Sequence, residues 1–532
     1  MSQNLEQFVR HLHHEIDEYR PVDWEVDWAD APLPYKLYRG VPAVKLPSEI
    51  PLTLTERAVE DEVDVTAISH FLWYVFGLAQ VSQMAYETDT DDASSEESPV
   101  AVMQSIRRLV PSGGGLYPSE LYMYLKVKGL AEGIYHYDAA HHRLVVLREG
   151  NFDAYLEKAL GQRCSISECF GAVLVTTVYW KNFFKYHYFG YRLQGLDTGV
   201  LMGQLLEVAK RFGFKAGVYF EFLDQAVNHL LGVSEQEESA FAVIPLSIKS
   251  VDEWVLKGAE PKERCTCAQL CRELPNVRYE QYIRSRKVIE SPMLVRINEA
   301  SALKDSAAFR WRGLKEADKR RALKGQGVVQ LPQVERLAYD LLEASRRRYS
   351  PGMDFIARKV TVAQAASLLN EAAASFAYTN DLDGEERVTV YGCFYGVDGI
   401  PDGAYRYDAS QHGLHPVRPG DQRGWLQSGM SLDNVNLYQV PLCLHVVGPK
   451  DHLIGALGYR GYRIQQMEAG MLVQRLILAA CALGFGVHPL LGYEVSTIDA
   501  LYSLEAEGMT ALIQLPIGPY RPRPRFEGGL HG

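Results

Sequence analysis

The chain contains two copies of one sequence pattern, and this duplication constrains its fold more than any other feature. Residues 133–144 read GIYHYDAAHHRL and residues 403–414 read GAYRYDASQHGL, an offset of 270. At an offset of 271, Gly190-Tyr191-Arg192, Gly199, Gly213-Phe214 and Pro245 recur as Gly461-Tyr462-Arg463, Gly470, Gly484-Phe485 and Pro516. Because this register continues without a gap, chance similarity is a poor explanation. We therefore expect an intrachain pseudo-dimer of two homologous halves.

Each half combines helical and strand patterns in matching places. Length and apolar spacing predict helices at Thr66–Val81, Thr198–Arg211, Thr361–Phe376 and Ala469–Leu483. Runs rich in β-branched and aromatic residues predict strands at Leu121–Val127, Ala172–Val178, Val388–Tyr395 and Val440–Val447. Helices that flank short antiparallel strands indicate an α+β fold, duplicated in tandem.

The repeat register suggests three segments in the 532 residues: a first copy with an N-terminal extension at 1–250, an inter-repeat segment at 251–335, and a second copy at 336–532. The inter-repeat segment contains a dense basic stretch, Lys304–Lys324, which is either a solvated linker or a docking segment for a biosynthetic partner. An acidic stretch, Glu87–Pro99, interrupts only the first copy and is expected to be a solvated insertion.

Composition limits the partners and the compartment. Hydrophobic residues make up 47% of the chain and charged residues 23%, which is typical of a globular protein with a core. A net charge of −11 argues against nonspecific binding to nucleic acid or to an anionic membrane surface. The first residues lack an apolar signal segment, and no uncharged apolar run is long enough to span a bilayer. We therefore expect a cytoplasmic protein, with further homo-oligomerisation open.

The most distinctive motif is RRLVPSGGGLYPSELY at residues 107–122, followed by GIYHYD and then by Lys185-Tyr186 ahead of Gly190-Tyr191-Arg192. Together these residues resemble the nitroreductase-like azoline dehydrogenases. The resemblance covers most of residues 40–250 and, more weakly, 340–525. It implies a nitroreductase-like fold, FMN as cofactor, and oxidation of thiazolines or oxazolines to thiazoles or oxazoles in peptide natural products.

The same resemblance implies that FMN lies between the halves and that the second half binds its phosphate. Arg346, Arg347, Arg348 and Ser350 stand where the family has an Arg-Arg-Ser element, and we expect them just before a helix. The resemblance further implies that Pro489, Leu490, Leu491 and Gly492 form a turn whose backbone N–H meets the flavin, and that Arg521, Arg523 and Arg525 add cations. Arginine suits phosphate because its fork of donors is always charged.

The first half is expected to supply the ring contact and the chemistry. Pro111, Ser112, Gly113 and Gly114 belong to a loop where glycine permits close approach to a planar ring. The resemblance makes Lys185 and Tyr186 the catalytic pair, with either residue as the base. The second half has NDLDGEERV in place of the glycine loop and Ala456-Leu457 in place of the pair. One complete site, and hence one FMN per chain, is the prediction.

Three cysteines, Cys265, Cys267 and Cys271, lack the fourth ligand that a structural zinc site needs, so no metal is expected. No nicotinamide-binding glycine fingerprint follows a strand, which favours oxygen as the electron acceptor. Two alternatives stay open: an NAD(P)H-dependent nitro- or quinone reductase, and a noncatalytic partner of a synthetase or cyclase. The expected partners are a peptide azoline substrate and a nonribosomal peptide synthetase or cyclase component, with delivery by leader peptide or carrier protein undecided.

Overall fold

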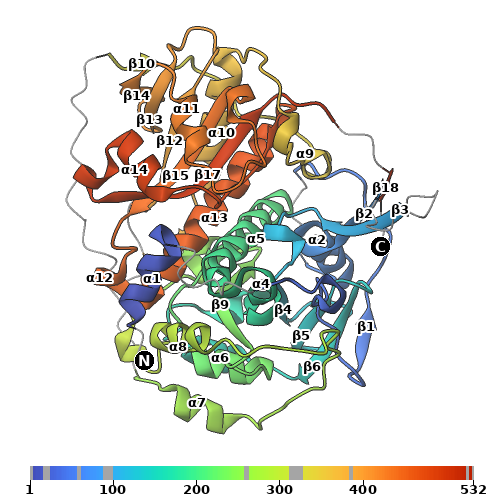
Figure 1. The fold of residues 1–532 in the computed structure, drawn as a ribbon. Coiled ribbons are helices and arrows are strands. Elements are labelled where there is room, and N and C mark those ends of the chain that lie inside the picture. Colours follow the sequence, from blue (N-terminus) through green and yellow to red (C-terminus); the bar gives the residue numbers. More distant parts are fainter. Residues whose placement is uncertain are drawn as a thin grey trace.

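The computed structural model describes residues 4–15, 24–56, 62–87, 100–256, 263–310, 327–382, 387–522 and 526–529. The first half forms the lower body in Figure 1 and the second half the upper body, with two long helices between them. No helix in these ranges is both long enough and apolar enough to cross a membrane.

The first half is built on one mainly antiparallel sheet with the order β1-β6-β5-β4-β7-β9-β8-β11. Its strands are β1 (Ala43–Lys45), β4 (Ser119–Leu125), β5 (Gly133–Asp138), β6 (Arg143–Glu149), β7 (Gly171–Val178), β8 (Lys215–Val218) and β9 (Glu238–Ser247). The last member, β11 (Thr379–Asn380), comes from the second half and pairs in parallel with β8. Buried residues on nearly every position of β4, β5 and β9 show that helices or loops cover both faces.

The second half has a sheet of the same order, β10-β14-β13-β12-β15-β17-β16. Its strands are β10 (Val329–Gln330), β12 (Thr389–Phe394), β13 (Gly403–Asp408), β14 (Gly413–Pro419), β15 (Leu442–Pro449), β16 (Gly486–Val487) and β17 (Met509–Gly518). Even the irregularities correspond. The register shifts at Ile134/Tyr135 and at Ala404/Tyr405, and again at Val175/Thr176 and at Val446/Val447. The spatial repeat therefore follows the repeat in the sequence.

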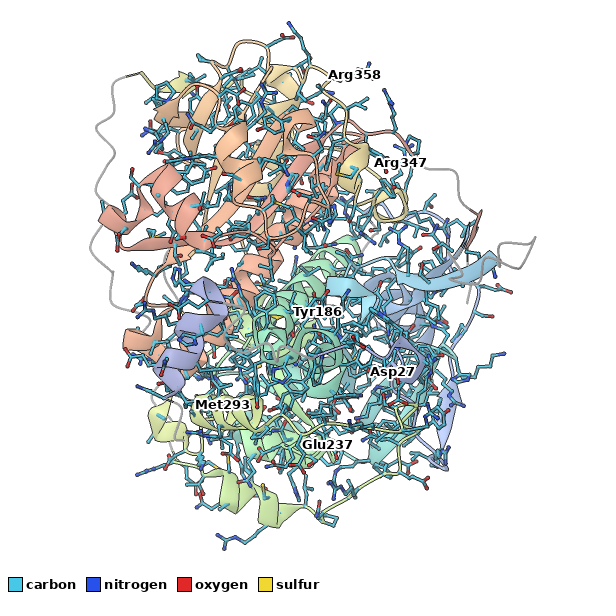
Figure 2. The ribbon with its side chains drawn as sticks, in the orientation of Figure 1. Asp27, Tyr186, Glu237, Met293, Arg347 and Arg358 are labelled. Carbon is cyan, nitrogen blue, oxygen red and sulfur yellow. The ribbon has the colours of Figure 1, made fainter. Side chains whose placement is uncertain are left out.

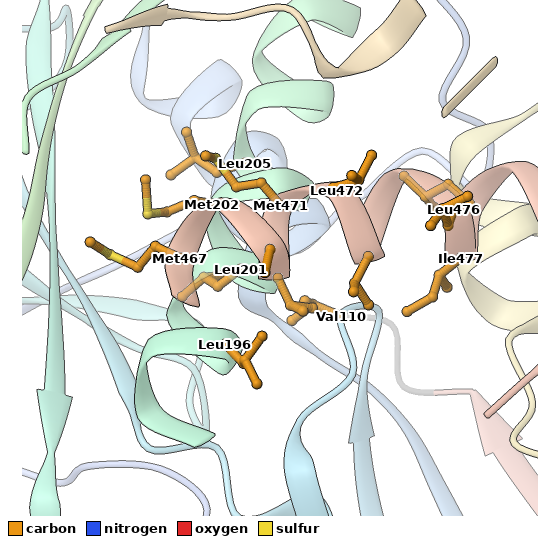
Figure 3. Packing of buried hydrophobic residues seen from close by; sticks show 14 of the residues in the cluster. Val110, Leu196, Leu201, Met202, Leu205, Met467, Met471, Leu472, Leu476 and Ile477 are labelled. Carbon is orange, nitrogen blue, oxygen red and sulfur yellow. The ribbon is translucent and has the colours of Figure 1, made fainter. Parts of the chain in front are cut away.

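Two long helices, α5 (Gly190–Arg211) and α13 (Tyr459–Ala482), form the most extensive contact between the halves. Nearly all of their residues are buried, including charged and amide side chains such as Arg192, Asp197 and Gln466, so the rest of the chain encloses both helices. Figure 3 shows leucine and methionine side chains of the two helices packed against one another. Each helix ends just before a glycine with a positive φ, Gly213 and Gly484, as the sequence predicts.

The remaining helices cover the sheets and the ends of the long helices. They are α1 (Leu5–His14), α2 (Val65–Phe76), α3 (Asp153–Ala159), α4 (Tyr179–Tyr186), α6 (Asp224–Leu231), α7 (Cys267–Glu273), α8 (Pro292–Ser301), α9 (Leu341–Arg347), α10 (Val362–Phe376), α11 (Arg423–Ser428), α12 (Ile454–Leu457) and α14 (Val495–Tyr502). The helix predicted at Thr361–Phe376 is present as α10, with Thr361 as a capping-box N-cap.

The helix predicted at Thr66–Val81 is wrong in its second part. The helix ends at Phe76, and β2 (Leu78–Glu87) begins after Gly77. Gly77 lies so close to the preceding turn that a Cβ there would be 2.6 Å from Cδ1 of Trp73. The apolar run continues beyond it because β2 pairs with β3 (Val100–Arg108) and with the C-terminal β18 (Phe526–Gly529).

Candidate functional site

The glycine loop between β3 and β4 is fixed by a buried carboxylate. It forms a short 3-10 turn, Gly113–Gly115, in which Gly114 and Gly115 have φ of 65° and 71°. Asp197, on α5, accepts hydrogen bonds from Ser112 Oγ at 2.7 Å and from the N–H of Gly113 at 3.0 Å. Sequence reasoning missed Asp197, because 84 residues separate it from Gly113 and no local pattern marks it.

The structure brings this loop against the predicted catalytic pair. Lys185 and Tyr186 lie at the end of α4, and both side chains reach Gly114. A Cβ on Gly114 would lie 2.6 Å from Tyr186 Oη and 3.2 Å from Lys185 Nζ. A larger residue there would displace the ends of both side chains, and the positive φ of Gly114 also favours glycine at this position even apart from a ligand.

Partial burial shifts the ionisation of these groups. Desolvation lowers the pKa of Lys185 from that of an exposed lysine, and it raises the pKa of Tyr186 to about 12. Desolvation also raises the pKa of Asp197 to about 6, against the opposing effect of its hydrogen bonds from Gly113 and Ser112. At neutral pH Tyr186 is therefore a protonated donor, and Lys185 loses its proton more readily than a lysine in water.

The predicted phosphate-binding arginines lie at the end of a helix and not before one. Asp340 caps the start of α9, so Arg346 and Arg347 fall in its last turn and Arg348 is its C-cap. Cations are favoured there by the helix dipole. Arg347 is exposed and pairs with Glu343, whereas Nη2 of Arg346 is buried and has no hydrogen-bond partner among the described residues.

Arg107 is a further basic residue next to Arg348, and it was not among the residues predicted to bind the phosphate. It lies on β3 of the first half, and its Nη2 donates to the backbone carbonyl of Arg348 in the second half. Its neighbour Arg108 has a structural role instead, since it donates to the carbonyls of Phe76 and Pro34. The double arginine that opens the motif could have drawn attention to Arg107, but only the contact across the halves separates the two roles.

The structure describes some of the other residues that were predicted to bind the phosphate. Ser350 follows Tyr349, whose ring stacks on Tyr520 with the centroids 5.0 Å apart, so this segment lies beside the end of β17. Arg521 is exposed, and its backbone N–H donates to the carbonyl of Asp354. Arg523 and Arg525 lie outside the described residues. Figure 2 labels Arg347 near the boundary between the halves, on the side facing β18.

The predicted flavin-contact turn presents two backbone donors. Pro489 precedes Leu490, whose N–H donates to the carbonyl of Gln514, so the N–H of Leu490 is already used. The N–H groups of Leu491 and Gly492 have no partner among the described residues. A turn with two adjacent donors of this kind suits a ligand with acceptor atoms in a plane.

The corresponding turn in the first half is closed by the protein itself. Tyr219 pairs with Val243 as Leu490 pairs with Gln514, both at an offset of 271. There the carboxylate of Asp381 accepts from the N–H of Phe220 at 2.9 Å and of Glu221 at 3.0 Å. Phe220 and Glu221 are the counterparts of Leu491 and Gly492. In the first half, the carboxylate of Asp381 thus occupies two backbone donors whose counterparts in the second half stay available.

The second half also replaces the glycine loop. Glu468, the counterpart of Asp197 on α13, accepts hydrogen bonds from the Arg387 guanidinium and from Tyr378 Oη at 2.6 Å. Arg387 and Tyr378 are bulky where Ser112 and Gly113 are small. Ala456 and Leu457, the counterparts of Lys185 and Tyr186, carry no ionisable group. Among the described residues, the glycine loop and the turn donors thus stay available in one set of groups, called the open site, whereas side chains fill their counterparts in the other set.

The open site has the features expected for FMN. The buried, unpartnered Nη2 of Arg346 suits a phosphate oxygen, the positive-φ glycines leave a cradle that a Cβ would fill, and two N–H groups await acceptors. Within the described residues no cluster of three or more His, Cys, Asp or Glu is arranged to bind a metal ion.

Comparison with known proteins gives two distant relatives in sequence and one match over nearly the whole fold. No family model matches the chain. The trifolitoxin-processing protein TfxB of Rhizobium leguminosarum bv. trifolii is 26% identical over 262 residues, which is 45% of this chain and 62% of TfxB. The microcin B17-processing protein McbC of Escherichia coli is 26% identical over 138 residues, which is 25% of this chain and 51% of McbC. The chain thus spans between half and two thirds of these relatives.

A crystal structure from Anabaena variabilis, described as a candidate nitroreductase, matches with a TM-score of 0.71 and 20% identity over 98% of this chain and all of that one. The fold is therefore the α+β fold of nitroreductases. The resemblance seen in the sequence is confirmed: the chain is distantly homologous to the TfxB and McbC processing proteins, which resemble nitroreductases.

Proposed function

We propose that this chain is an FMN-dependent oxidoreductase that converts thiazoline or oxazoline rings in a peptide to thiazoles or oxazoles. Its distant homology to two peptide-processing proteins supports the peptide substrate. The observation that carries the proposal is the meeting of Lys185 Nζ and Tyr186 Oη with the loop at Gly114, directly beside the buried Asp197.

The two halves would share the binding of one FMN. Arg346, Arg107 and Arg348 would bind its phosphate, and the backbone N–H groups of Leu491 and Gly492 would donate to its ring system; the unpartnered Nη2 of Arg346 and the Arg107–Arg348 contact support this. Gly113 and Gly114 offer the flat backbone surface. FMN bound there would supply the hydride acceptor, with oxygen as the final electron acceptor. The closed counterpart at Asp381 leaves room for a single cofactor in each pseudo-dimer.

Residues of the chain would move the proton. Ring oxidation removes a proton from the carbon that bears the carbonyl and a hydride from the adjacent ring carbon, a loss of two electrons overall. The lowered pKa of Lys185 makes its neutral amine the base for that proton. Tyr186, with its pKa of about 12, stays protonated and donates a hydrogen bond that orients the ring nitrogen. Asp197 positions the glycine loop by accepting a hydrogen bond from Ser112 Oγ.

Delivery of the substrate would need a partner, either a leader-peptide-binding cyclase component or a carrier protein of a synthetase. The basic stretch Lys304–Lys324 was the candidate docking segment, and residues 311–326 lie outside the described residues. The docking role therefore stays a prediction.

The test is direct. The purified protein should be yellow because it binds FMN. It should also oxidise a thiazoline-containing peptide in a reaction that consumes oxygen, with many turnovers for each FMN. Fast reduction of the flavin by NADPH with no thiazoline oxidation would instead identify a nitro- or quinone reductase. A colourless protein that takes up no FMN would identify a noncatalytic partner.

A further inference from the structure

One exposed tryptophan stands beside the proposed proton-transfer pair. Trp28 lies in the N-terminal extension, at the start of a 3-10 turn, Trp28–Asp30, and its side chain is 54% exposed. Lys185 Nζ lies 5.2 Å from the centroid of the indole ring. The side-chain nitrogen of Lys185 thus lies near both the indole of Trp28 and the glycine loop at Gly114.

The turn that carries Trp28 is fixed despite this exposure. The carboxylate of Asp30 accepts from the N–H of Arg286 at 2.7 Å and of Lys287 at 3.0 Å. Ser285 Oγ donates to the carbonyl of Asp30 and accepts from Trp180 Nε1 at 2.9 Å. Two segments outside the paired sheets, the N-terminal extension and the inter-repeat segment, are thereby joined to α4.

The indole itself is oriented by α4. Its ring meets the ring of Phe184 edge to face, with the centroids 5.7 Å apart and the planes at 78°. Phe184 is buried and precedes Lys185 directly. An edge-to-face contact fixes the tilt of a ring, and the 54% exposure of Trp28 leaves part of the indole open to a ligand. Trp28 is therefore an exposed aromatic side chain with a defined orientation, on a turn that several hydrogen bonds hold in place.

The position of Lys185 limits which ligand groups can contact the exposed part of the indole. A base must lie within about 3 Å of the proton that it removes, so the reacting ring must lie close to Lys185 Nζ. Since the indole centroid lies 5.2 Å from the same nitrogen, a ring that reaches Lys185 from the side of the indole also contacts Trp28. A flat five-membered heterocycle and an indole face stack well because both are planar π-systems.

We propose that Trp28 is a specificity-determining residue that stacks against the five-membered heterocycle of the substrate. This inference rests on the proposed function for the identity of the ring. It assigns substrate recognition to the N-terminal extension, which neither copy of the repeat contains.

The experiment compares wild type, Trp28→Phe, Trp28→Leu and a control, Trp425→Leu. Trp425 is also exposed, at 40%, but lies on α11 of the second half and stacks on Arg418. The probes are a thiazole dipeptide, whose Kd is measured by equilibrium dialysis with the FMN-loaded protein, and the corresponding thiazoline dipeptide, for kcat and KM. FMN content should be equal in all four proteins.

Loss of stacking should raise Kd and KM about tenfold in Trp28→Leu, while Trp28→Phe stays within about threefold of wild type and Trp425→Leu is unchanged. Unchanged Kd and KM in Trp28→Leu would overturn the inference. A lower kcat with a shifted pH profile and an unchanged KM would also overturn it, because Trp28 would then act only through Lys185.

Failure of the two proposals can be told apart. If wild type binds the thiazole dipeptide in a Trp28-dependent way but never oxidises the thiazoline, the proposed reaction is wrong and the recognition by Trp28 stands. If wild type oxidises the thiazoline and Trp28→Leu matches it in Kd, kcat and KM, the reaction stands and the role of Trp28 is wrong.

Discussion

Gly199 on α5 and Gly470 on α13 meet where the two long helices cross, and they are counterparts at the repeat offset of 271. A Cβ on Gly470 would lie 2.9 Å from the Cα of Gly199 and 2.2 Å from the carbonyl oxygen of Leu196. A Cβ on Gly199 would lie 2.0 Å from the carbonyl oxygen of Met467. The backbones thus approach as closely as glycine allows, and this crossing sets the spacing of the two halves around the site.

Replacing Gly470 by Ala should separate the helices, because the added carbon meets backbone that cannot rotate away. We expect the free energy of unfolding to fall by about 1–3 kcal/mol, as for other overpacked cores. Urea denaturation measures this loss. Gly424→Ala, in α11, is the matched control, since its Cβ would meet nothing closer than Tyr438 Oη at 3.7 Å. An unchanged stability of Gly470→Ala would show that the crossing is not tightly packed.

Cofactor content should be near one FMN per 532-residue chain. The donors of Phe220 and Glu221 are already bonded to Asp381, and Glu468 holds Arg387 and Tyr378 where the glycine loop would be. Flavin absorbance after denaturation, divided by protein concentration, gives the ratio. Two FMN per chain would contradict the composite single site, whatever the enzyme's activity.

Retention of FMN should depend on Arg346. Its buried Nη2 lacks a partner among the described residues, and a charged hydrogen bond to phosphate contributes about 1.5–3 kcal/mol. Arg346→Ala should therefore raise the Kd for FMN by roughly ten- to a hundredfold. Arg358→Ala, an exposed arginine of the same half that Figure 2 labels far from Tyr186, should bind FMN normally. Equal affinity in both variants would remove Arg346 from the phosphate site.

Lys185→Ala and Tyr186→Phe should leave the protein yellow and folded but slow thiazoline oxidation by roughly 10²–10⁴-fold. The base acts as a neutral amine, so the wild-type rate should rise with pH as Lys185 deprotonates, and burial places that rise below the pKa of an exposed lysine. Lys185→Ala should lose this limb of the pH profile. Single-turnover flavin reduction measures it, and full rates in both variants would exclude the pair.

Asp197 should make stability depend on pH. Its pKa of about 6 is above the usual carboxyl value of 3.8, so the folded state binds the proton more tightly than the unfolded state does. The free energy of unfolding should therefore fall as pH rises from about 4 to about 6 and then level off. Asp197→Asn should remove the contribution of Asp197 to this pH dependence. Asp499→Asn should likewise remove the contribution of Asp499, because the pKa of Asp499 is also raised to about 6.

Only Asp197→Asn should also change turnover, because Asp499 bonds to Thr510 and Ala511 in the second half and not to the glycine loop. In wild type, turnover should decline below about pH 6 as neutral Asp197 binds Ser112 and Gly113 less strongly. A decline that persists in Asp197→Asn would place its origin in another group.

The sequence alone determined the duplication, a central set of helices and strands in each half, and the composition of the glycine loop. Periodicity and capping residues act over a few positions, so Thr361 and the apolar run after it were enough to predict α10. The glycines of the loop, Gly113 and Gly114, carried their own physical reason, since a Cβ excludes close approach.

Only the tertiary structure decided which polar groups meet. Asp197, Arg107 and Asp381 act on partners that lie 84, 241 and about 160 residues away in the chain. Local sequence cannot rank such contacts, because a carboxylate or a guanidinium looks the same wherever its partner comes from. The break of the predicted helix at Gly77 has the same origin, since pairing of β2 with β3 and β18 outweighed a continuous apolar pattern.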